Sequence, residues 1–173
     1  MRDSGFLPKI EQSKLVPSGY TDRVAQGTPY NRLAHLLGNA AGNGGLFSTV
    51  SDVVNYMQIL LNKGKLPRFG QKVFTEEAVN LTLTVGKYSR YKNTRVLGWE
   101  TVPEKNCPCG TKFSPSPDSF GASDPSASYV WADRLRNITI VFLANGAFPG
   151  GHAPEAAGWQ GRLSDAVMTA LGH

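Results

Sequence analysis

The sequence predicts an α+β fold, in which an antiparallel sheet of about three strands carries a C-terminal helix and lies beside part of a helical subdomain. Three observations lead to this prediction. An amphipathic stretch covers residues 46–64, two strand-like runs joined by a short polar turn lie between residues 126 and 145, and a second amphipathic stretch closes the chain. Helix and strand patterns that occur in separate blocks are typical of α+β domains.

The stretch from Leu46 to Gly64 carries the strongest helical pattern. Thr49 is placed to act as its N-cap, Asp52 suits the positive end of the helix dipole, and Gly64 supplies the left-handed residue that ends the helix. The apolar residues recur at i, i+3, i+4 and i+7, and so predict one buried face: Val50, Val53, Val54, Met57, Leu60 and Leu61.

Residues 1–45 precede this helix and show little periodicity, because proline and glycine interrupt them repeatedly. We expect an extended segment that lies along a cleft on other structure. Residues 46–85 are expected to form part of a helical subdomain, in which Thr75 caps a second helix. Residues 96–173 are expected to form the sheet and the C-terminal helix. The whole chain, 1–173, is then a single partial domain.

The strands of this sheet are expected at Val96–Val102, Ser126–Asp133 and Ile138–Asn145, with a turn at residues 134–137 between the last two. A glycine- and proline-rich link leads to the last helix. Its apolar residues again follow helical spacing and predict a buried stripe: Leu163, Ala166, Val167, Ala170 and Leu171.

Charge and composition exclude several classes of function. The net charge of +5 comes from scattered bases without interleaved aromatic residues, so we expect no nucleic-acid partner. The longest apolar run, Ile138–Ala144, is far too short to span a bilayer, and no signal peptide opens the chain, so the product as written is expected to be cytosolic. No residue pattern indicates a metal or another cofactor.

The two cysteines form the motif Cys107-Pro108-Cys109. We interpret this spacing as too tight for an ordinary disulfide, and two thiols alone do not make a zinc site. They are therefore expected to be loop cysteines. A redox or metal role is the alternative interpretation.

Five short motifs, taken in order, resemble the serine β-lactamase-related family, which includes class C β-lactamases, penicillin-binding proteins and related esterases. The resemblance covers nearly the whole chain and implies a β-lactamase/transpeptidase-like fold, of which this chain is the C-terminal part. The motifs are Met1–Phe6, Gly44–Thr49, Leu97–Glu100, Ser119–Gly121 with Tyr129–Asp133, and Val141–Asn145.

The family's chemistry depends on an S-x-x-K nucleophile motif, a Tyr- or Ser-x-Asn motif, and a K-T-G or H-T-G motif. The resemblance implies that the first two lie upstream of the stretch that matches Met1–Phe6. An S-x-x-K does occur at Ser89–Lys92, and Tyr91–Asn93 imitates the second motif. A chain of this composition carries roughly one S-x-x-K match by chance. We therefore predict no catalytic residue in this chain.

The resemblance places the third motif on Ala122, Ser123 and Asp124. Ala122 replaces the cation, Ser123 keeps a hydroxyl, and Asp124 replaces the glycine that lets substrate approach the strand. Pro125 occupies the position whose backbone N–H completes the oxyanion hole in the family, and proline has no N–H. These four residues are the candidate substrate-binding site in degenerate form.

Three interpretations follow. The chain is a catalytically incompetent member of the family, or part of an active serine hydrolase whose nucleophile lies in a missing upstream segment or a partner chain, or a non-catalytic module that binds a small molecule in the groove around Ser123 and Tyr129. Whether it is an enzyme is thus left open. Apolar faces without partners further predict a homo-oligomer, a missing partner segment, or marginal solubility.

Overall fold

The computed structural model describes residues 1–18, 25–83, 95–102, 107, 109–113, 118–124, 126–146, 148 and 158–173. The chain divides into two compact units. The first comprises Met1–Val53, Asp124–Ser128 and Phe142–Glu155, and the second comprises Val54–Ser123, Tyr129–Val141 and Ala156–His173. The proposed division at residues 45, 85 and 96 stays a prediction.

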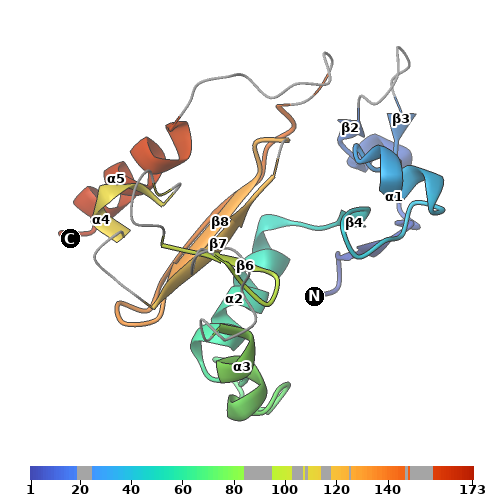
Figure 1. The fold of residues 1–173 in the computed structure, drawn as a ribbon. Coiled ribbons are helices and arrows are strands. Elements are labelled where there is room, and N and C mark those ends of the chain that lie inside the picture. Colours follow the sequence, from blue (N-terminus) through green and yellow to red (C-terminus); the bar gives the residue numbers. More distant parts are fainter. Residues whose placement is uncertain are drawn as a thin grey trace. The chain divides into compact units, whose positions relative to one another are not determined.

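The second unit is built on a five-stranded sheet, ordered β5-β6-β7-β8-β9 (Figure 1). Its β7–β8 hairpin is antiparallel and pairs five residues of each strand, from Ser119↔Asp133 to Ser123↔Tyr129. The α+β class and the antiparallel sheet are therefore confirmed. The strands are β5 (Arg95–Val96), β6 (Trp99–Thr101), β7 (Ser119–Ser123), β8 (Tyr129–Asp133) and β9 (Ile138–Phe142).

The predicted single strand at 96–102 is wrong in detail, because it folds back on itself. Val96 pairs with Trp99, so β5 and β6 form a tight hairpin. Gly98 has a φ of +84°, a conformation that side chains with a Cβ rarely adopt. The short turn therefore depends on the glycine, and it adds a strand that the alternation of apolar residues did not predict.

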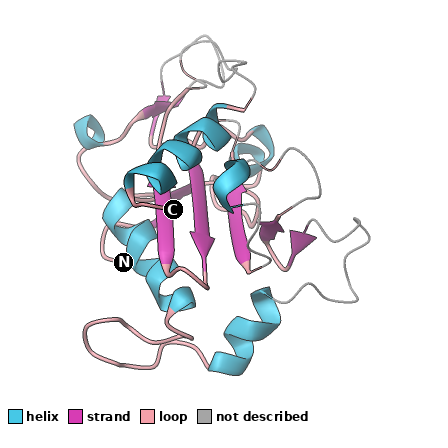
Figure 2. Ribbon diagram, turned by 90° about the vertical axis from the view of Figure 1, so that its left-hand side faces the viewer, coloured by secondary structure: helices cyan, strands magenta, loops and turns pink. Residues whose placement is uncertain are grey.

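One face of the sheet carries the main core of the second unit. Two helices, α4 (Gly110–Phe113) and α5 (Trp159–Ala170), pack together on this side (Figure 2). The rings of Tyr129 and Trp131 stack with centroids 6.2 Å apart. The buried cluster consists of Cys109, Phe113, Tyr129, Trp131, Ile140 and Met168.

The C-terminal helix is confirmed, but its buried face differs from the predicted stripe. Gly161, Ser164 and Met168 are buried, whereas Ala166, Ala170 and Leu171 are exposed. The reason is close approach. A Cβ on Gly161 would lie 3.2 Å from the Cα of Gly110, so only a very small residue lets α5 contact α4 there. A search for periodic apolar residues does not detect buried positions that are occupied by small or polar residues.

The opposite face of the sheet carries an aromatic row. Trp99 on β6 stacks on Tyr56 with centroids 6.3 Å apart, and meets Phe120 on β7 edge-on at 5.3 Å. Tyr56 comes from α2 (Val50–Leu61), whose Met57 and Leu60 are also buried. The sheet of this unit therefore lies between helices on both faces.

The predicted helix N-caps at Thr49 and Thr75 are both confirmed. The N–H of Asp52 donates to Thr49 Oγ1 at 3.3 Å, and the N–H of Ala78 donates to Thr75 Oγ1 at 3.0 Å at the start of α3 (Glu76–Leu83). Gly64 closes the end of α2 with a φ of +87°, and its N–H donates to the carbonyl of Ile59 at 2.8 Å. These are the hydrogen bonds that capping residues supply at unsatisfied helix ends.

The first unit consists of short elements. Its two-stranded ribbons pair Gly5 with Phe47 and Pro17 with Gln26. The elements are β1 (Gly5–Phe6), the 3₁₀ turn Gln12–Lys14, β2 (Pro17–Ser18), β3 (Ala25–Gln26), α1 (Arg32–Leu36) and β4 (Leu46–Phe47). The expected course of residues 1–45 along a cleft stays a prediction.

The interpretation of the cysteines as unpaired loop residues is wrong. Cys107 and Cys109 form a disulfide, with their Cα atoms 5.0 Å apart. That separation lies within the ordinary range for disulfides, and an extended two-residue step would exceed it, so the turn before α4 is what brings the sulfurs together. Spacing in the sequence is a poor guide here because the local backbone decides the distance.

Two findings concern the described residues alone. No helix among them combines the length and the apolar character needed to cross a membrane. They contain no group of three or more His, Cys, Asp or Glu side chains that could hold a metal ion.

Candidate functional site

The candidate site lies at the end of β7, where Ala122 and Ser123 are the last two residues of the strand. On one side both residues pair with β8, as Ala122↔Val130 and Ser123↔Tyr129. On the other side the β6–β7 ladder ends at Glu100↔Gly121. Among the described residues, this end of β7 therefore has a strand on one side only. An open strand edge presents backbone groups that an extended ligand can pair with.

The side chains at this edge supply little chemistry. Ala122 carries no charge, and the side chain of Ser123 is exposed. Within the part of the chain that the structure describes, no hydrogen bond of the Ser123 hydroxyl is found. A serine becomes a nucleophile only when a base or a desolvated charged neighbour removes its proton.

Asp124 follows the strand and belongs to the tight turn before β8. Its carboxylate oxygen Oδ1 accepts a hydrogen bond from the N–H of Ser126 at 2.8 Å, and its own N–H donates to the carbonyl of Ser128 at 3.0 Å. The carbonyl of Asp124 accepts from the N–H of Ala127 at 2.9 Å. This is the local bonding by which aspartate stabilises turns. Asp124 is therefore engaged as a structural residue.

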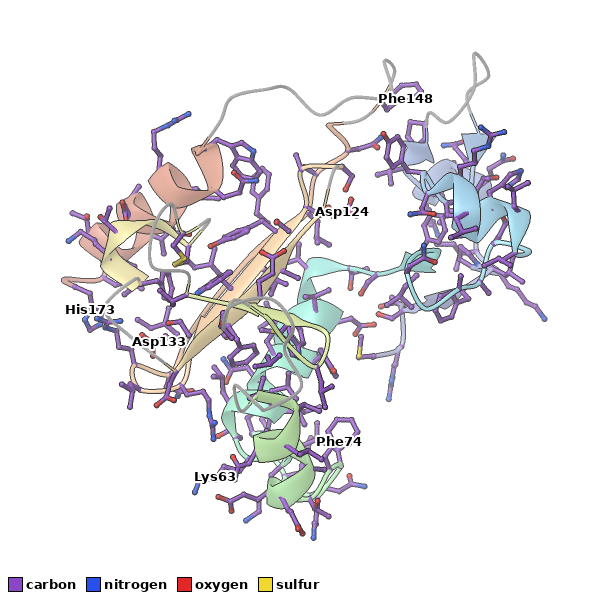
Figure 3. All side chains as sticks on the ribbon, viewed as in Figure 1. Lys63, Phe74, Asp124, Asp133, Phe148 and His173 are labelled. Atoms are coloured by element: carbon purple, nitrogen blue, oxygen red, sulfur yellow. A yellow bond between two sulfur atoms is a disulfide. The ribbon has the colours of Figure 1, made fainter. Side chains whose placement is uncertain are left out.

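The candidate residues thus belong to one hairpin. Figure 3 shows Asp124 at the end of the β7–β8 hairpin opposite to Asp133. Pro125, the remaining candidate, lies outside the described residues. Ser89–Lys92 also falls outside them, because residues 84–94 are not described. The placement of Ala122, Ser123, Asp124 and Pro125 as a substrate-binding site stays a prediction.

Tyr129 was expected to line a groove with Ser123, but it lies in the core. The residue is 1% exposed, and its hydroxyl shares a hydrogen bond of 2.8 Å with Ser164 on α5. Burial raises the pKa of the Tyr129 phenol. A neutral phenol that already has a partner and no access to solvent cannot contact a ligand at the surface. Of that expected pair, only Ser123 is available.

A second polar cluster, in the first unit, was only partly indicated by the sequence. The carboxylate of Asp52 accepts hydrogen bonds from the Ser4 hydroxyl and from the N–H of Asp3, both at 2.8 Å, and Ser4 Oγ also lies 2.7 Å from Ser48 Oγ. The Ser4 hydroxyl is the main cause that lowers the pKa of Asp52. We interpret the cluster as structural, because it fixes the start of the chain to the N-terminus of α2.

Comparisons with known proteins agree with this fold. No family model matches the chain. Over 110 residues the chain is 28% identical to an Escherichia coli K12 protein described as a "Putative D-alanyl-D-alanine carboxypeptidase", and the match covers 63% of this chain and 24% of that protein. The chain therefore spans about a quarter of the length of this relative.

A solved structure gives a similar result at the level of the fold. The crystal structure described as a "putative beta-lactamase from Bacteroides dorei DSM 17855" superposes with a TM-score of 0.50 at 14% identity, over 79% of this chain and 44% of that one. An identity this low supports the fold alone. Together, the two matches support a relationship to a β-lactamase/transpeptidase-like, serine-hydrolase-related family, without distinguishing between its carboxypeptidase and β-lactamase branches.

Proposed function

We propose that this chain contributes the substrate side of a β-lactamase/transpeptidase-like fold and does not catalyse acyl transfer by itself. The observation that supports this most directly is the end of β7. Ala122 offers no cation, no hydrogen bond from the Ser123 hydroxyl to a base is found among the described residues, and the Asp124 carboxylate is bonded to the turn. Acyl transfer by a serine hydrolase needs an activated nucleophile and donors that stabilise the oxyanion.

The sequence adds two arguments. Pro125 has no N–H to donate, and removing one oxyanion-hole donor typically slows an enzyme by roughly 100- to 1000-fold. Ser89–Lys92 is the one S-x-x-K in the chain, and a match of this length arises readily by chance. Both arguments favour a chain that is catalytically incompetent as it stands.

The alternative is that the chain is part of an active hydrolase of β-lactams, peptides or esters, whose nucleophile comes from another segment or a partner chain. The lengths of the matched proteins support it, since the matches cover 24% of one and 44% of the other. In that case Ser123 would contact the substrate while another part of the fold supplied the reacting serine. The two proposals differ in where a covalent probe would attach.

A labelling experiment separates them. The purified 173-residue chain is treated with a fluorophosphonate and, in parallel, with a fluorescent penicillin, and is then examined by intact mass. We expect no covalent adduct, while a serine hydrolase in the same tube is labelled fully. A stoichiometric adduct on the chain would overturn the proposal. The variant Ser89→Ala would then show whether the S-x-x-K serine carries it, with Ser123→Ala as the matched control.

The alternative requires the protein from its native source. If this sequence is part of an active hydrolase, the labelled species there contains the peptides of this chain within a longer polypeptide or a tight complex. Mass spectrometry of the labelled species would identify them. A native protein whose intact mass equals that of this chain, and which takes no label, would contradict the alternative.

The open edge of β7 favours a second candidate function, which is non-catalytic binding of an extended peptide. Such a peptide would add its backbone beside Ala122 and Ser123, with the exposed hydroxyl as a further donor. A library of short extended peptides is screened for binding to the chain. The affinity of a peptide that binds is then measured by calorimetry. Ser123→Ala should weaken binding, whereas Ser51→Ala, at an exposed position on α2, should not. Saturable binding that both variants retain would place the ligand elsewhere.

A further inference from the structure

The Cys107–Cys109 disulfide lies beside the core of the second unit and has no part in the proposed function. The two half-cystines are only two residues apart in the sequence. Cys109 is completely buried in the core cluster with Phe113 and Met168, whereas Cys107 is half-buried at its rim. Cys107 is therefore the more exposed half-cystine of the pair, and Cys109 the enclosed one.

The contacts around this disulfide hold the turn in place without the sulfur–sulfur bond. The N–H of Gly110 donates to the carbonyl of Cys107 at 3.1 Å. The carboxylate of Asp165 on α5 accepts from the N–H of Lys112 and from the Thr111 hydroxyl, both at 2.9 Å. These bonds connect α4 to α5 through atoms other than the two sulfurs, so we expect them to persist when the thiols are reduced.

The bond also contributes little by restricting the unfolded chain. The loop-closure entropy that a disulfide removes grows with the number of residues between its ends, and here the loop is among the shortest that a chain can close. A crosslink that is neither needed for local packing nor effective against the unfolded state has no evident structural purpose. The reactivity of the disulfide is therefore a better guide to its role than its contribution to stability.

The surroundings of the two sulfurs give them different roles. The N–H of Cys109 donates to Sγ of Cys107 at 3.2 Å. A hydrogen bond to sulfur stabilises its thiolate form, so Cys107 is the more reactive thiol of the reduced protein and is readily released from a mixed disulfide. Cys109, which is buried, is the partner with which Cys107 forms or breaks the disulfide ring. An accessible sulfur backed by a buried one is the arrangement that thiol–disulfide exchange requires.

We propose that Cys107 and Cys109 form a thiol–disulfide exchange site whose reaction partner is a dithiol reductant. The first reductant thiolate attacks Sγ of Cys107, the Cys107–Cys109 bond breaks, and Cys109 leaves as a thiolate that takes up a proton. The second reductant thiol, as its thiolate, attacks the reductant sulfur of this mixed disulfide and expels Cys107 as a thiolate. Two electrons pass to the protein, which becomes a dithiol, and the reductant becomes a disulfide.

The first test compares rates of reduction. The folded protein and the same protein in urea are treated with dithiothreitol, quenched with an alkylating reagent at intervals, and the alkylated fraction is read by intact mass. We expect native reduction within about tenfold of the rate in urea, because Cys107 is reachable without unfolding. Reduction that occurs only at the rate of global unfolding would overturn the proposal, because it would mean that the bond is inaccessible in the folded state.

The second test uses single variants in which one thiol remains. Cys109→Ser leaves Cys107 as the free thiol, and Cys107→Ser leaves Cys109. With glutathione disulfide, Cys109→Ser should form the mixed disulfide at least about tenfold faster, because its thiol is the exposed and hydrogen-bonded one. Equal rates, or faster reaction of Cys107→Ser, would contradict the assigned roles.

The double variant Cys107→Ser/Cys109→Ser tests whether the disulfide is needed for folding. It should fold with an unchanged far-ultraviolet circular dichroism spectrum and melt cooperatively, because Asp165 and the Gly110 turn hold α4 without the sulfurs. A double variant that does not fold would show that the bond is structural and would overturn the proposal. The serine-hydrolase probes have no bearing on these measurements, so the two proposals fail independently.

Discussion

The two units of this chain differ in what they bury. In the second unit the large side chains of Trp131, Phe113 and Met168 are all completely shielded from solvent. In the described part of the first unit, the buried apolar side chains are the small ones of Pro29, Ala34 and Ala127, while Leu36 is 70% exposed. Shielded apolar area is the main favourable term in folding, so the second unit has a core of its own, whereas the described residues of the first unit show no comparable core.

This difference indicates which part of the chain can fold without help. A two-stranded ribbon is marginally stable in water unless it packs on something, and the first unit contains two such ribbons of two residues per strand. The matched proteins extend well beyond the aligned region, which covers 24% and 44% of them. We infer that the exposed apolar residues of the first unit are the ones that need a covering surface.

The largest effect is expected at Gly121 in the second unit. A Cβ there would lie 2.2 Å from Cε3 of Trp131 and 2.3 Å from the carbonyl oxygen of Val130. Because the backbone oxygen cannot give way cheaply, Gly121→Ala should lower the free energy of unfolding by about 3 kcal/mol or prevent folding. Urea denaturation followed by tryptophan fluorescence measures this.

The matched control is Gly5→Ala in the first unit. A Cβ on Gly5 meets nothing within 4 Å, so the change should stay within about 0.5 kcal/mol. Comparable losses at both positions would contradict the contrast, because they would mean that the first unit is packed as tightly as the second.

The parts of the fold that could be predicted from the sequence are those that depend on residues close together in the chain. The helices α2 and α3 were predicted with their caps, because Thr49, Thr75 and Gly64 act through bonds to residues close in the chain. The β5–β6 hairpin and the true buried face of α5 were missed. Both depend on glycines, Gly98 and Gly161, whose role is to occupy a conformation or a space that no apolar pattern records.

For the candidate site, the assignment of Ala122, Ser123, Asp124 and Pro125 from the sequence stays a prediction. The structure places Ala122 and Ser123 at the end of β7, a strand that the sequence pattern did not predict, where both pair with β8. The bonds of Asp124 within the turn and the burial of Tyr129 against Ser164 could not be predicted, because they depend on neighbours brought together by folding. The disulfide was missed for the same reason.

The next largest effect is expected at Tyr129. Tyr129→Phe removes a buried hydroxyl and leaves Ser164, which is fully buried, without this partner. The loss should be about 1–2 kcal/mol at neutral pH, measured by urea denaturation. The described residues of the first unit include no pair of hydroxyl groups that is fully buried in this way, so the effect is specific to the second unit.

Because of Tyr129, the stability of the folded protein is also expected to depend on pH in the alkaline range. Burial raises the pKa of Tyr129 above the ordinary value of 10.0, so the folded protein holds this proton more tightly than the unfolded chain does. The stabilisation is complete below about pH 10 and is lost as the pH rises further. Tyr129→Phe should flatten this alkaline decline, and an unchanged decline would mean that other groups cause it.

A smaller effect, at acid pH, is expected in the first unit. The Ser4 hydroxyl and the N–H of Asp3 lower the pKa of Asp52 below its ordinary value of 3.8. The carboxylate therefore stabilises the folded state above that value, and the stabilisation is lost as the pH falls through the lower, folded-state pKa. Hydrogen exchange at the Asp3 amide should become faster at pH 3 than the change in intrinsic rate explains, and Asp52→Asn should show fast exchange at neutral pH as well. Exchange in Asp52→Asn that matches the parent would show that the carboxylate does not hold this segment.

The smallest effect on stability, and the most direct test of an uncovered surface, is expected on α1. Leu36 is 70% exposed there, so Leu36→Gln should change the free energy of unfolding by less than about 0.5 kcal/mol. If exposed apolar residues of the first unit drive association between copies, the same change should lower the mass measured by light scattering at a given concentration. Leu135→Gln, at a 68% exposed position in the second unit, is the matched control and should leave the mass unchanged. A chain that is monomeric at every concentration, with either variant, would mean that the first unit does not pair with its own copies, and a segment of different sequence would then be the surface that covers it.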